Sequence, residues 1–325
     1  MFRKISAHIV RALALLFIGF AAQAQTAPWP TKPIHLIIST PAGGGMDALA
    51  RIIGEEITAK VKQPVIVESK TGANGTVSAE WVARAPPDGY TLLLVTNAQL
   101  TVNPHLQKMR FDPLTDLRHI SQITLAQNML VIRPQLKINT LPELISYAKA
   151  NPGKLNYGSS GNGSLQHIGA ELFQRMTGTK FTHIAYKGGL PARLDLLAGN
   201  IDLMFADMGT LPAVNAGQLK AIAVTGAARD PAAPNLPTLS ELGLKGYAVE
   251  GYYLLSAPAQ TPDAIVRRLE EIVTEMLKKP EVIERIQTIF HRPATDSSSK
   301  YVNQLLRRDY GQYGKLIQDF NIRTE

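Results

Sequence analysis

The chain contains no cysteine among its 325 residues. Disulfides, thiolate catalysis and cysteine-based metal sites are therefore excluded, and so is a tether through a lipid-modified cysteine. A chain of this length can bury enough apolar surface to fold without cross-links.

Short motifs that bind nucleotides or metals are also missing. No loop matches the Walker A pattern Gly-x-x-x-x-Gly-Lys-Ser/Thr, and the first glycine-rich loop lacks the Gly-x-Gly-x-x-Gly of dinucleotide sites. The seven histidines show no His-Glu-x-x-His or similar spacing, and no pair of carboxylates for acid–base chemistry can be identified. We therefore expect no cofactor and no metal.

Long apolar runs are scarce, and the one that matters lies at the start of the chain. The chain begins with three positive charges, at Arg3, Lys4 and Arg11. An uncharged apolar run over 12–22 follows them and leads into the small-x-small sequence 22–24. This order is typical of a cleavable secretory signal, and the run is shorter than the roughly 20 residues of a membrane span. We expect cleavage after Ala24, which leaves 325 − 24 = 301 residues.

The net charge of the chain limits the kinds of partner that we expect. The chain has 34 Lys and Arg against 26 Asp and Glu, and removal of the three signal cations leaves 31 − 26 = +5. A mild positive field is compatible with an anionic ligand. No basic run is interleaved with aromatic residues, so we expect no nucleic-acid partner.

Short apolar runs alternate with amphipathic stretches along the rest of the chain. Strands are predicted at 34–40, 64–68, 90–96, 129–133, 155–158, 181–185, 201–205, 221–225 and 252–257, and helices at 47–61, 76–85, 141–150, 165–177, 191–198, 262–279, 281–289 and 298–318. Such alternation predicts an α/β fold of mostly parallel sheets flanked by helices.

Two such units follow one another, separated by a loop-rich stretch over 104–116. We therefore expect two lobes, with the chain crossing between them near 125–132 and returning near 249–256. The predicted lobes are 25–128 plus 250–325, and 129–249.

Three glycine-rich turns each join a predicted strand to a predicted helix, at 41–45, 159–164 and 186–189. The first N–H groups of a helix lack internal partners and carry partial positive charge. Glycine lets an anion approach that backbone closely, and ligands of open α/β sheets bind at this edge. A single such loop more often serves the turn itself, but two loops, one in each lobe, favour a grip on both ends of one anion.

Polar side chains at the same edge are further candidates. Thr96 and Asn97 end one strand and Asp207 ends another, while His167 follows the second loop. Asp207 is placed to orient an amino or hydroxyl group, although capping the next turn is the commoner role of such a residue. His167 can bind a carboxylate or, equally well, pack in the core. Tyr252 and Tyr253 are interpreted as strand packing.

An enzymatic alternative is a periplasmic hydrolase that uses Ser160 and His167. The sequence Gly158-Ser159-Ser160-Gly161 only approaches the Gly-x-Ser-x-Gly elbow, and no acid partner can be recognised. We therefore expect no enzyme activity.

A set of short motifs runs in order from about residue 29 to 290. It comprises Pro41-Ala42-Gly43-Gly44-Gly45-Met46-Asp47 with Ala50-Arg51, Pro64-Val65-Ile66-Val67-Glu68, Asp88-Gly89-Tyr90-Thr91-Leu92-Leu93, Asn103-Pro104, Pro152-Gly153-Lys154-Leu155, Gly161-Asn162-Gly163-Ser164 with His167, Tyr186-Lys187-Gly188, Asp202-Leu203-Met204-Phe205 and Pro237-Thr238. This set resembles the Bug family of periplasmic solute-binding proteins, the binding components of tripartite tricarboxylate transporters. Each match is loose, but the set is specific.

The resemblance implies a two-lobed, Venus-flytrap fold of type II character in the periplasm. It implies that a ligand carboxylate is held around the first loop and that the second loop and nearby polar groups close on the other end. The ligand residues carried over by position are Thr40, Ala42, Gly43, Gly44, Thr96, Asn97, Ser160, Gly161, Asn162, His167 and Asp207.

The resemblance also implies the partners: a small organic acid and the permease subunits of a tripartite tricarboxylate transporter. A ligand-sensing partner of a membrane receptor is the alternative with the same pocket. Met46 and Ala185 depart from the usual Thr or Ser and Pro, which points to a different ligand rather than a different function. We expect a monomer, because the lobes must move.

Overall fold

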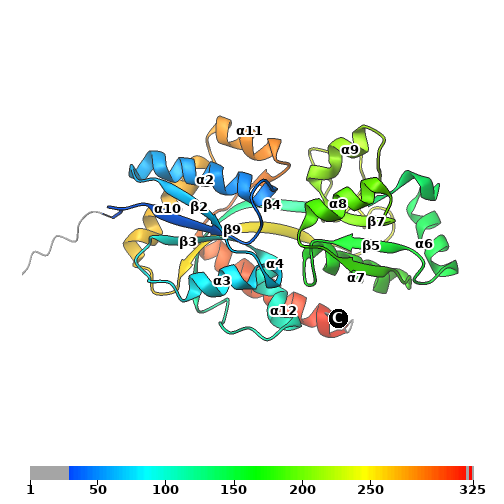
Figure 1. Cartoon of the computed structure of the whole chain (residues 1–325), viewed down its shortest axis with the longest axis horizontal. Helices are drawn as coiled ribbons and strands as arrows, with labels where there is room; N and C mark the ends of the chain where they lie inside the picture. The colour runs from blue at the N-terminus through cyan, green and yellow to red at the C-terminus, as the bar shows by residue number, and fades with distance from the viewer. Residues whose placement is uncertain (1–28, 320–321, 324–325) are drawn as a thin grey trace, which may run out of the picture.

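The computed structural model describes residues 29–319 and 322–323. The predicted signal peptide over 1–24 and its cleavage site lie outside the described residues. Two lobes lie side by side, joined by long strands that run between them (Figure 1). None of the helices in the described part is long and apolar enough to cross a membrane.

Lobe 1 is built on three parallel strands, β1 (Ile34–Ile38), β2 (Val65–Ser69) and β3 (Thr91–Thr96), in the order β2-β1-β3. The helix α2 (Gly45–Val61) connects β1 to β2, and the helix α3 (Thr76–Ala83) lies between β2 and β3 along the chain. The apolar run of β1 is buried on both faces, as a central parallel strand requires.

Lobe 2 repeats this arrangement with β5 (Asn156–Ser159), β6 (Thr182–Ala185) and β7 (Leu203–Asp207) in the order β6-β5-β7. The helices α7 (Leu165–Thr177) and α8 (Gly189–Ala198) make the corresponding connections. At the start of α7 the Ser164 hydroxyl accepts a hydrogen bond from the His167 N–H at 3.3 Å, and Gly178 ends the helix with φ +67°.

The remaining elements complete the two lobes. They are α4 (Asn97–Thr101), α5 (Asn103–Leu106), α6 (Leu141–Ala150), α9 (Leu211–Asn215), β8 (Lys220–Val224), α10 (Asp263–Met276), α11 (Pro280–Thr288), β10 (Arg292–Pro293) and α12 (Ser299–Asp319), with short 3-10 turns at Ala73–Gly75, Pro134–Leu136 and Met208–Thr210.

Two antiparallel strands, β4 (Leu117–Ile132) and β9 (Glu250–Pro258), carry the chain between the lobes. β4 pairs with β9 as far as Gln127 and with β7 from Asn128 onward. The α/β fold class is confirmed, but the sheet is mixed, because these two strands run antiparallel to their neighbours. We call residues 125–128 of β4 and 249–252 around the start of β9 the hinge.

The prediction for β4 was too short, since it gave only 129–133. Residues over 117–128 also form strand, and their side chains are polar at His119, Ser121, Gln122, Thr124 and Gln127. All five of these side chains are buried. The strand therefore lacks the apolar pattern that identifies a buried strand in sequence. Neighbouring elements bond the side chains of His119, Thr124 and Gln127.

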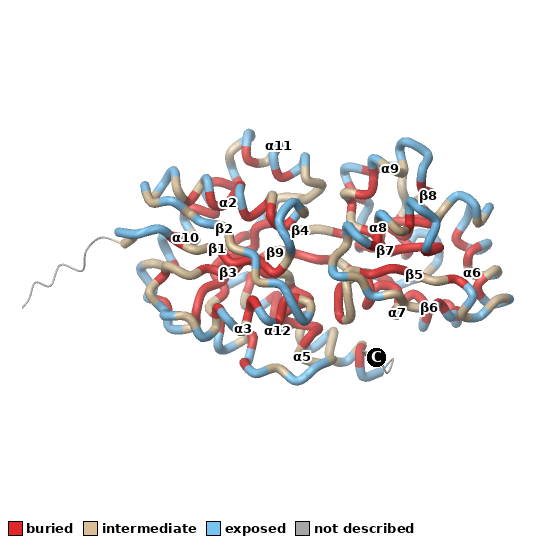
Figure 2. The backbone as a smooth tube through the Cα atoms, in the orientation of Figure 1, coloured by how far each residue is buried: buried red, intermediate tan, exposed pale blue. Residues whose placement is uncertain are grey.

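Apolar side chains fill both faces of the sheet in each lobe, and Figure 2 shows the buried backbone concentrated in the strands. A further cluster spans the lobes, with Ala98 and Val102 on lobe 1, Ile168 on lobe 2, and Ile317 and Ile322 from the C-terminal segment. The lobes therefore contact each other beyond the hinge strands.

Candidate functional site

The loops that follow β1 and β3 in lobe 1 face the loops that follow β5 and β7 in lobe 2. A Cβ built on Gly163 would lie 2.7 Å from Oδ1 of Asn103, so the second glycine loop touches lobe 1. Asp207 pairs with Asn128 of β4, and Tyr253 of β9 pairs with Thr124 of the same strand. At about 3.3 Å per residue, four residues of β4 separate the two sides by roughly 13 Å.

We call this region the inter-lobe site. Its lobe 1 side comprises Thr40–Gly44, Thr96, Tyr253 and His291, and its lobe 2 side comprises Ser160, Gly161, Gly189, Arg193 and Asp207.

The first loop is held open by its own side-chain bonds. Gly43 has φ +88°, and its N–H donates to Oδ2 of Asp47 at 3.0 Å. Arg51 donates to the same oxygen at 3.1 Å. Burial alone would raise the pKa of Asp47, but the Gly43 N–H and the Arg51 guanidinium lower it overall, so this carboxylate is charged. Asp47 thus fixes the turn, and the next N–H groups at the start of α2 are left for a ligand.

Thr40 offers a free hydroxyl at this loop. Its Oγ1 is buried and makes no hydrogen bond among the described residues, while its carbonyl oxygen accepts from the Ser69 hydroxyl at 2.7 Å. A buried polar group without a partner costs about 1–3 kcal/mol. A ligand oxygen at the start of α2 can satisfy it. Ala42 and Gly43 are exposed beside it and Gly44 is half-buried.

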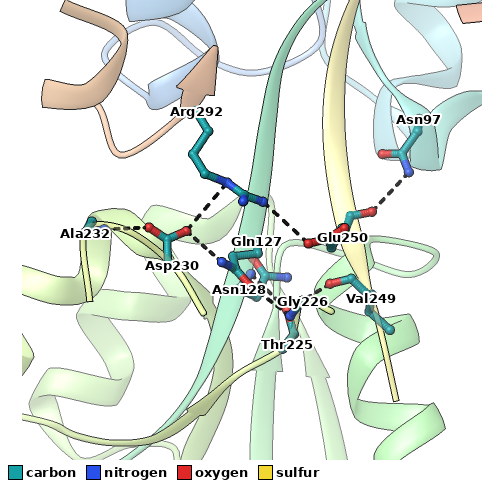
Figure 3. Close-up of polar contacts among 10 residues, drawn as sticks. All are labelled: Asn97, Gln127, Asn128, Thr225, Gly226, Asp230, Ala232, Val249, Glu250 and Arg292. Atoms are coloured by element: carbon teal, nitrogen blue, oxygen red, sulfur yellow. Dashed lines mark hydrogen bonds and ion pairs between the residues drawn. The ribbon is translucent and has the colours of Figure 1, made fainter. Parts of the chain in front are cut away.

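Thr96 and Asn97, predicted together, differ in position. Thr96 is half-buried at the end of β3, and its N–H donates to Oε1 of Gln99 at 3.3 Å. Asn97 is fully buried, donates to the Glu250 carbonyl at 3.3 Å and accepts from the Tyr252 N–H at 3.2 Å. Asn97 therefore holds the returning strand at the hinge (Figure 3).

The second loop is tied to α7. The Ser160 N–H donates to Oε1 of Gln166 at 2.7 Å, and Gly161, with φ +127°, donates to the Ser159 hydroxyl at 3.1 Å. Ser160, Gly161 and Asn162 are each half-buried. A loop held in this way presents its turn to lobe 1 in a fixed conformation.

His167 lies beneath this loop rather than on its surface. It is 3 % exposed, its Nδ1 accepts from the Gly163 N–H at 3.2 Å, and its ring stacks on His183 with centroids 4.4 Å apart. Burial lowers the pKa of His167 to about 4, so the ring is neutral at pH 7. Its observed role is to support the loop, and direct contact with a ligand stays a prediction.

The Ser–His pair in this lobe is not the one considered from sequence. Ser159 Oγ lies 2.7 Å from Nε2 of His183, whereas His167 is committed to Gly163. Ser159 is fully buried, and its hydroxyl also donates to the Gly161 carbonyl at 3.2 Å. This buried hydroxyl has no access to an acyl substrate.

Asp207 lies next to Arg193 on the lobe 2 side of the site. Its carboxylate lies 3.8 Å from Nη1 of Arg193 and accepts from the Gly209 N–H, and half of its side-chain surface (51 %) is exposed. Partial removal of water from around the carboxyl group nevertheless raises the pKa of Asp207, although the positive charge of Arg193 lowers it. A cation and a carboxyl group side by side can bind a ligand carboxylate and an adjacent hydroxyl or ammonium group.

Three residues of this site were missed from sequence. Arg193 lies one turn into α8, and that position after the third glycine loop was the available signal. Tyr253 was assigned to packing, but it is half-buried at the site. Desolvation and then the nearby charge of Asp207 raise its pKa. His291 has no local sequence signal.

The family model described as "Tripartite tricarboxylate transporter family receptor" matches residues 49–322. A relative from Bordetella pertussis, described as a UPF0065 protein, is 34 % identical over 317 residues, which cover 97 % of each chain.

Solved structures agree. The periplasmic binding protein BugD superposes with a TM-score of 0.84 at 30 % identity, covering 91 % of this chain and 100 % of BugD. R. palustris Rpa4515 with adipate superposes with a TM-score of 0.86 at 31 % identity, covering 91 % of this chain and 99 % of the other. MatC from Rhodopseudomonas palustris with bound malate superposes with a TM-score of 0.83 at 28 % identity, covering 89 % of this chain and 100 % of MatC.

Proposed function

Because this chain belongs to the tripartite tricarboxylate transporter receptor family, whose members are periplasmic solute-binding proteins and not enzymes, we propose that it captures a small carboxylate between its lobes and delivers it to a membrane transporter. The observation that carries this proposal is the pair of opposed anion-binding groups. The start of α2 with the Thr40 hydroxyl lies on one lobe, and Arg193 beside Asp207 lies on the other.

Dicarboxylates are the first candidates. Adipate and malate are bound by two structural neighbours, and a separation of roughly 13 Å between the two backbones leaves room for a short chain once side chains narrow it. Tricarboxylates, acidic amino acids and aromatic acids belong to the same proposal. The ligand residues remain those predicted from sequence, with Arg193 added from the structure.

We also propose lobe boundaries at 128/129 and 249/250. The change of partner along β4 between Gln127 and Asn128, one residue from the first boundary, supports it. The signal peptide is proposed to end at Ala24, and the mature protein to act as a monomer.

The test is a thermal-shift screen of the mature protein against a panel of carboxylic and amino acids. A ligand that binds only the native state at 100 times its Kd stabilises it by about 2.7 kcal/mol, which corresponds to a rise in Tm of about 5 °C for a protein of this size. Such a rise with one class of acid supports the proposal and identifies the ligand. A flat response to every acid contradicts it.

Delivery to a transporter is supported by exposed apolar side chains on α8. Leu190, Leu194 and Leu197 recur at helical spacing on one face and expose 49 %, 57 % and 38 % of their surface. The helix α3, in the equivalent place in lobe 1, exposes Val77 and Trp81 at 45 % and 43 %. Apolar patches of this kind mark protein contacts, and a transporter that touches both lobes can sense their relative position.

We expect the double substitution Leu190→Gln with Leu194→Gln to leave the ligand Kd unchanged and to reduce uptake at least tenfold in cells that depend on this protein. The matched control is Leu242→Gln, another exposed leucine at 39 %, which lies outside these helices. Full uptake by the double variant would argue against α8 as the contact.

A further inference from the structure

Three successive residues that follow α11, the last of them the first residue of β10, contact three different parts of the molecule. Phe290 packs against the lobe 2 apolar cluster around Met129 and Leu196, although it belongs to the C-terminal part of lobe 1. His291 lies at the first loop, and Arg292 reaches the hinge. The segment 290–292 thus joins the ligand loop, the hinge and the opposite lobe.

His291 faces the start of α2. A Cβ built on Gly45, the first residue of that helix, would lie 3.8 Å from Nε2 of His291. The other ring nitrogen, Nδ1, lies 3.2 Å from the Thr124 hydroxyl, and the ring centroid lies 4.8 Å from that of Tyr253. Nε2 makes no hydrogen bond to any described residue, so the ring is fixed on one side and available on the other.

This geometry suits a ligand oxygen. When Nδ1 accepts from the Thr124 hydroxyl, the neutral imidazole carries its proton on Nε2 and donates there. Burial lowers the pKa of His291 to about 4, which keeps the ring neutral at pH 7. The helix dipole attracts a ligand anion to the start of α2 without fixing its orientation. A neutral N–H donor beside the helix start would add a directional hydrogen bond to a ligand oxygen.

The backbone that aims His291 is strained. Phe290 has φ +60°, a left-handed conformation that is unfavourable for a residue with a side chain. The packing of its side chain on lobe 2 offsets this cost. Strain of this kind persists where surrounding structure fixes it and is common at ligand sites.

Arg292 anchors the same segment to the hinge. Its Nη2 lies 3.4 Å from Oε1 of Glu250, and its Nε lies 4.0 Å from Oδ2 of Asp230 (Figure 3). Asp230 also accepts from Nε2 of Gln127 at 2.8 Å and from the Ala232 N–H at 2.9 Å. Asp230 and Gln127 are buried, so these bonds are shielded from water.

The Arg292 contact with Asp230 is incomplete. Nε is buried and has no hydrogen-bond partner among the described residues, which is costly for a charged group. Asp230 belongs to lobe 2 and β10 pairs with β4 in lobe 1, at Arg292 with Leu125. A small rotation of the lobes therefore makes or breaks the Nε–Asp230 bond.

We propose that His291 is a further ligand-contacting residue that determines which acid binds, and that Arg292 is the positioning residue that holds it in place through the hinge. The inference rests on the proposed function for the identity of the ligand as a carboxylate. Because the two residues are adjacent in sequence, movement of the hinge shifts the imidazole at the first loop.

The first experiment measures the Kd of adipate and of malate by calorimetry for wild type, His291→Ala and His291→Gln. We expect His291→Ala to weaken the preferred acid at least tenfold and to change the ratio of the two Kd values. Glutamine keeps an N–H donor, so His291→Gln should restore part of the affinity. The matched control is His35→Ala, at the opposite end of β1, which should leave both Kd values unchanged.

The second experiment follows the side-chain ¹⁵N signal of His291 Nε2 by NMR, identified by its loss in His291→Gln. Adding the preferred acid should shift this signal in wild type. Arg292→Gln should shift it even without ligand and should weaken binding about threefold to tenfold, with partial recovery in Arg292→Lys. The control is Arg118→Gln. Arg118 lies on β4, the strand with which β10 pairs, but its partners are Asp263 and Thr261 rather than the hinge residues.

The outcomes separate the two proposals. If wild type binds no acid of the thermal-shift panel, the proposed function fails and the ligand contact of His291 fails with it. If wild type binds an acid and His291→Ala keeps both the affinity and the ratio, only the further inference is overturned. An unchanged His291 signal in folded Arg292→Gln overturns the positioning role.

Discussion

At the residue scale, the conformation of Gly43 decides how close a ligand can approach the first loop. Its φ of +88° lies in the left-handed region, and a Cβ there would meet no atom within 4 Å. A side chain at this position therefore disturbs the loop by backbone strain rather than by a clash with the fold. The cost is about 1–2 kcal/mol for an ordinary residue and larger for a β-branched one.

We expect Gly43→Val to raise the ligand Kd more than a hundredfold, about 2.7 kcal/mol, while the circular dichroism spectrum and cooperative unfolding are retained. Gly217→Val is the matched control, because Gly217 has φ +72° and equally open surroundings but lies between α9 and β8. Calorimetric titration of both variants decides the matter. Equal affinity of wild type and Gly43→Val would remove the first loop from the site.

Asp207 separates ligands by their second functional group. Next to Arg193, its carboxylate can accept a hydrogen bond from a hydroxyl or ammonium group of the ligand. Loss of a hydrogen bond to a charged group costs about 1.5–3 kcal/mol. We expect Asp207→Asn to weaken malate at least tenfold and not to weaken adipate, which has no such group. Asp263→Asn, at the outer end of lobe 1, serves as the control, and parallel losses for both acids would contradict this role.

At the element scale, the segment just after β8 packs closely against the hinge strands at Gly226. A Cβ on Gly226, just after β8, would lie 2.2 Å from Oε1 of Gln127 and 2.6 Å from Oε1 of Glu250. The Gly226 N–H also donates to that Gln127 oxygen at 2.9 Å. The Thr225 hydroxyl next to it donates to the Val249 carbonyl at 2.9 Å, so one short segment bonds both hinge strands (Figure 3).

Gly226→Ala should therefore lower the free energy of unfolding by about 1–3 kcal/mol, the usual cost of overpacking. Gly311→Ala is the matched control in α12, where the added methyl group meets nothing within 4 Å. A helical Gly→Ala change of that kind stabilises by about 0.5–1 kcal/mol. Urea unfolding should show opposite signs for the two variants, and the same sign for both would show that the hinge tolerates the methyl group.

At the scale of the whole molecule, buried histidines make stability depend on pH in both lobes. His119 in lobe 1 and His167 in lobe 2 are 1 % and 3 % exposed, and burial lowers the pKa of each to about 4. Between pH 6.5 and 4 the unfolded chain binds protons that the native chain does not. Stability is therefore full above pH 6.5 and falls as the pH drops through this window.

The expected loss for His119 and His167 is about 3 kcal/mol each by pH 4, at 1.36 kcal/mol per pH unit. Urea unfolding at pH 7.5, 5.5 and 4.5 measures it. His119→Gln should be less stable at pH 7.5, because the ring bonds the Ser256 hydroxyl and the Pro113 carbonyl, yet should lose less between pH 7.5 and 4.5. A wild-type stability that is flat over this range would contradict the assignment.

Much of this molecule could be predicted from local patterns. The helix over 47–61 and the strand over 90–96 were located within two residues, because apolar periodicity and glycine turns act over a few neighbours. The three glycine turns do lie between strands and helices, and Thr96 and Asp207 are the last residues of β3 and β7. Thr40 and Ser160 lie just past the ends of β1 and β5. Whether these residues bind ligand stays a prediction.

The sequence by itself determined the α/β elements, their order, the absence of disulfides and the family. Only the tertiary structure decided that Ser159 pairs with His183, that Tyr253 lies against His291, and that Arg292 meets Asp230 and Glu250. These partners come from separate elements. The pairing of the parallel strands β5 and β6 brings Ser159 to His183, and the pairing of β10 with β4 brings Arg292 to the hinge. Whether a stretch forms a helix or a strand depends on the spacing of its apolar residues along the chain. Which charged group or hydroxyl lies next to another depends on the order of the strands in the sheet, and no short stretch of sequence specifies that order.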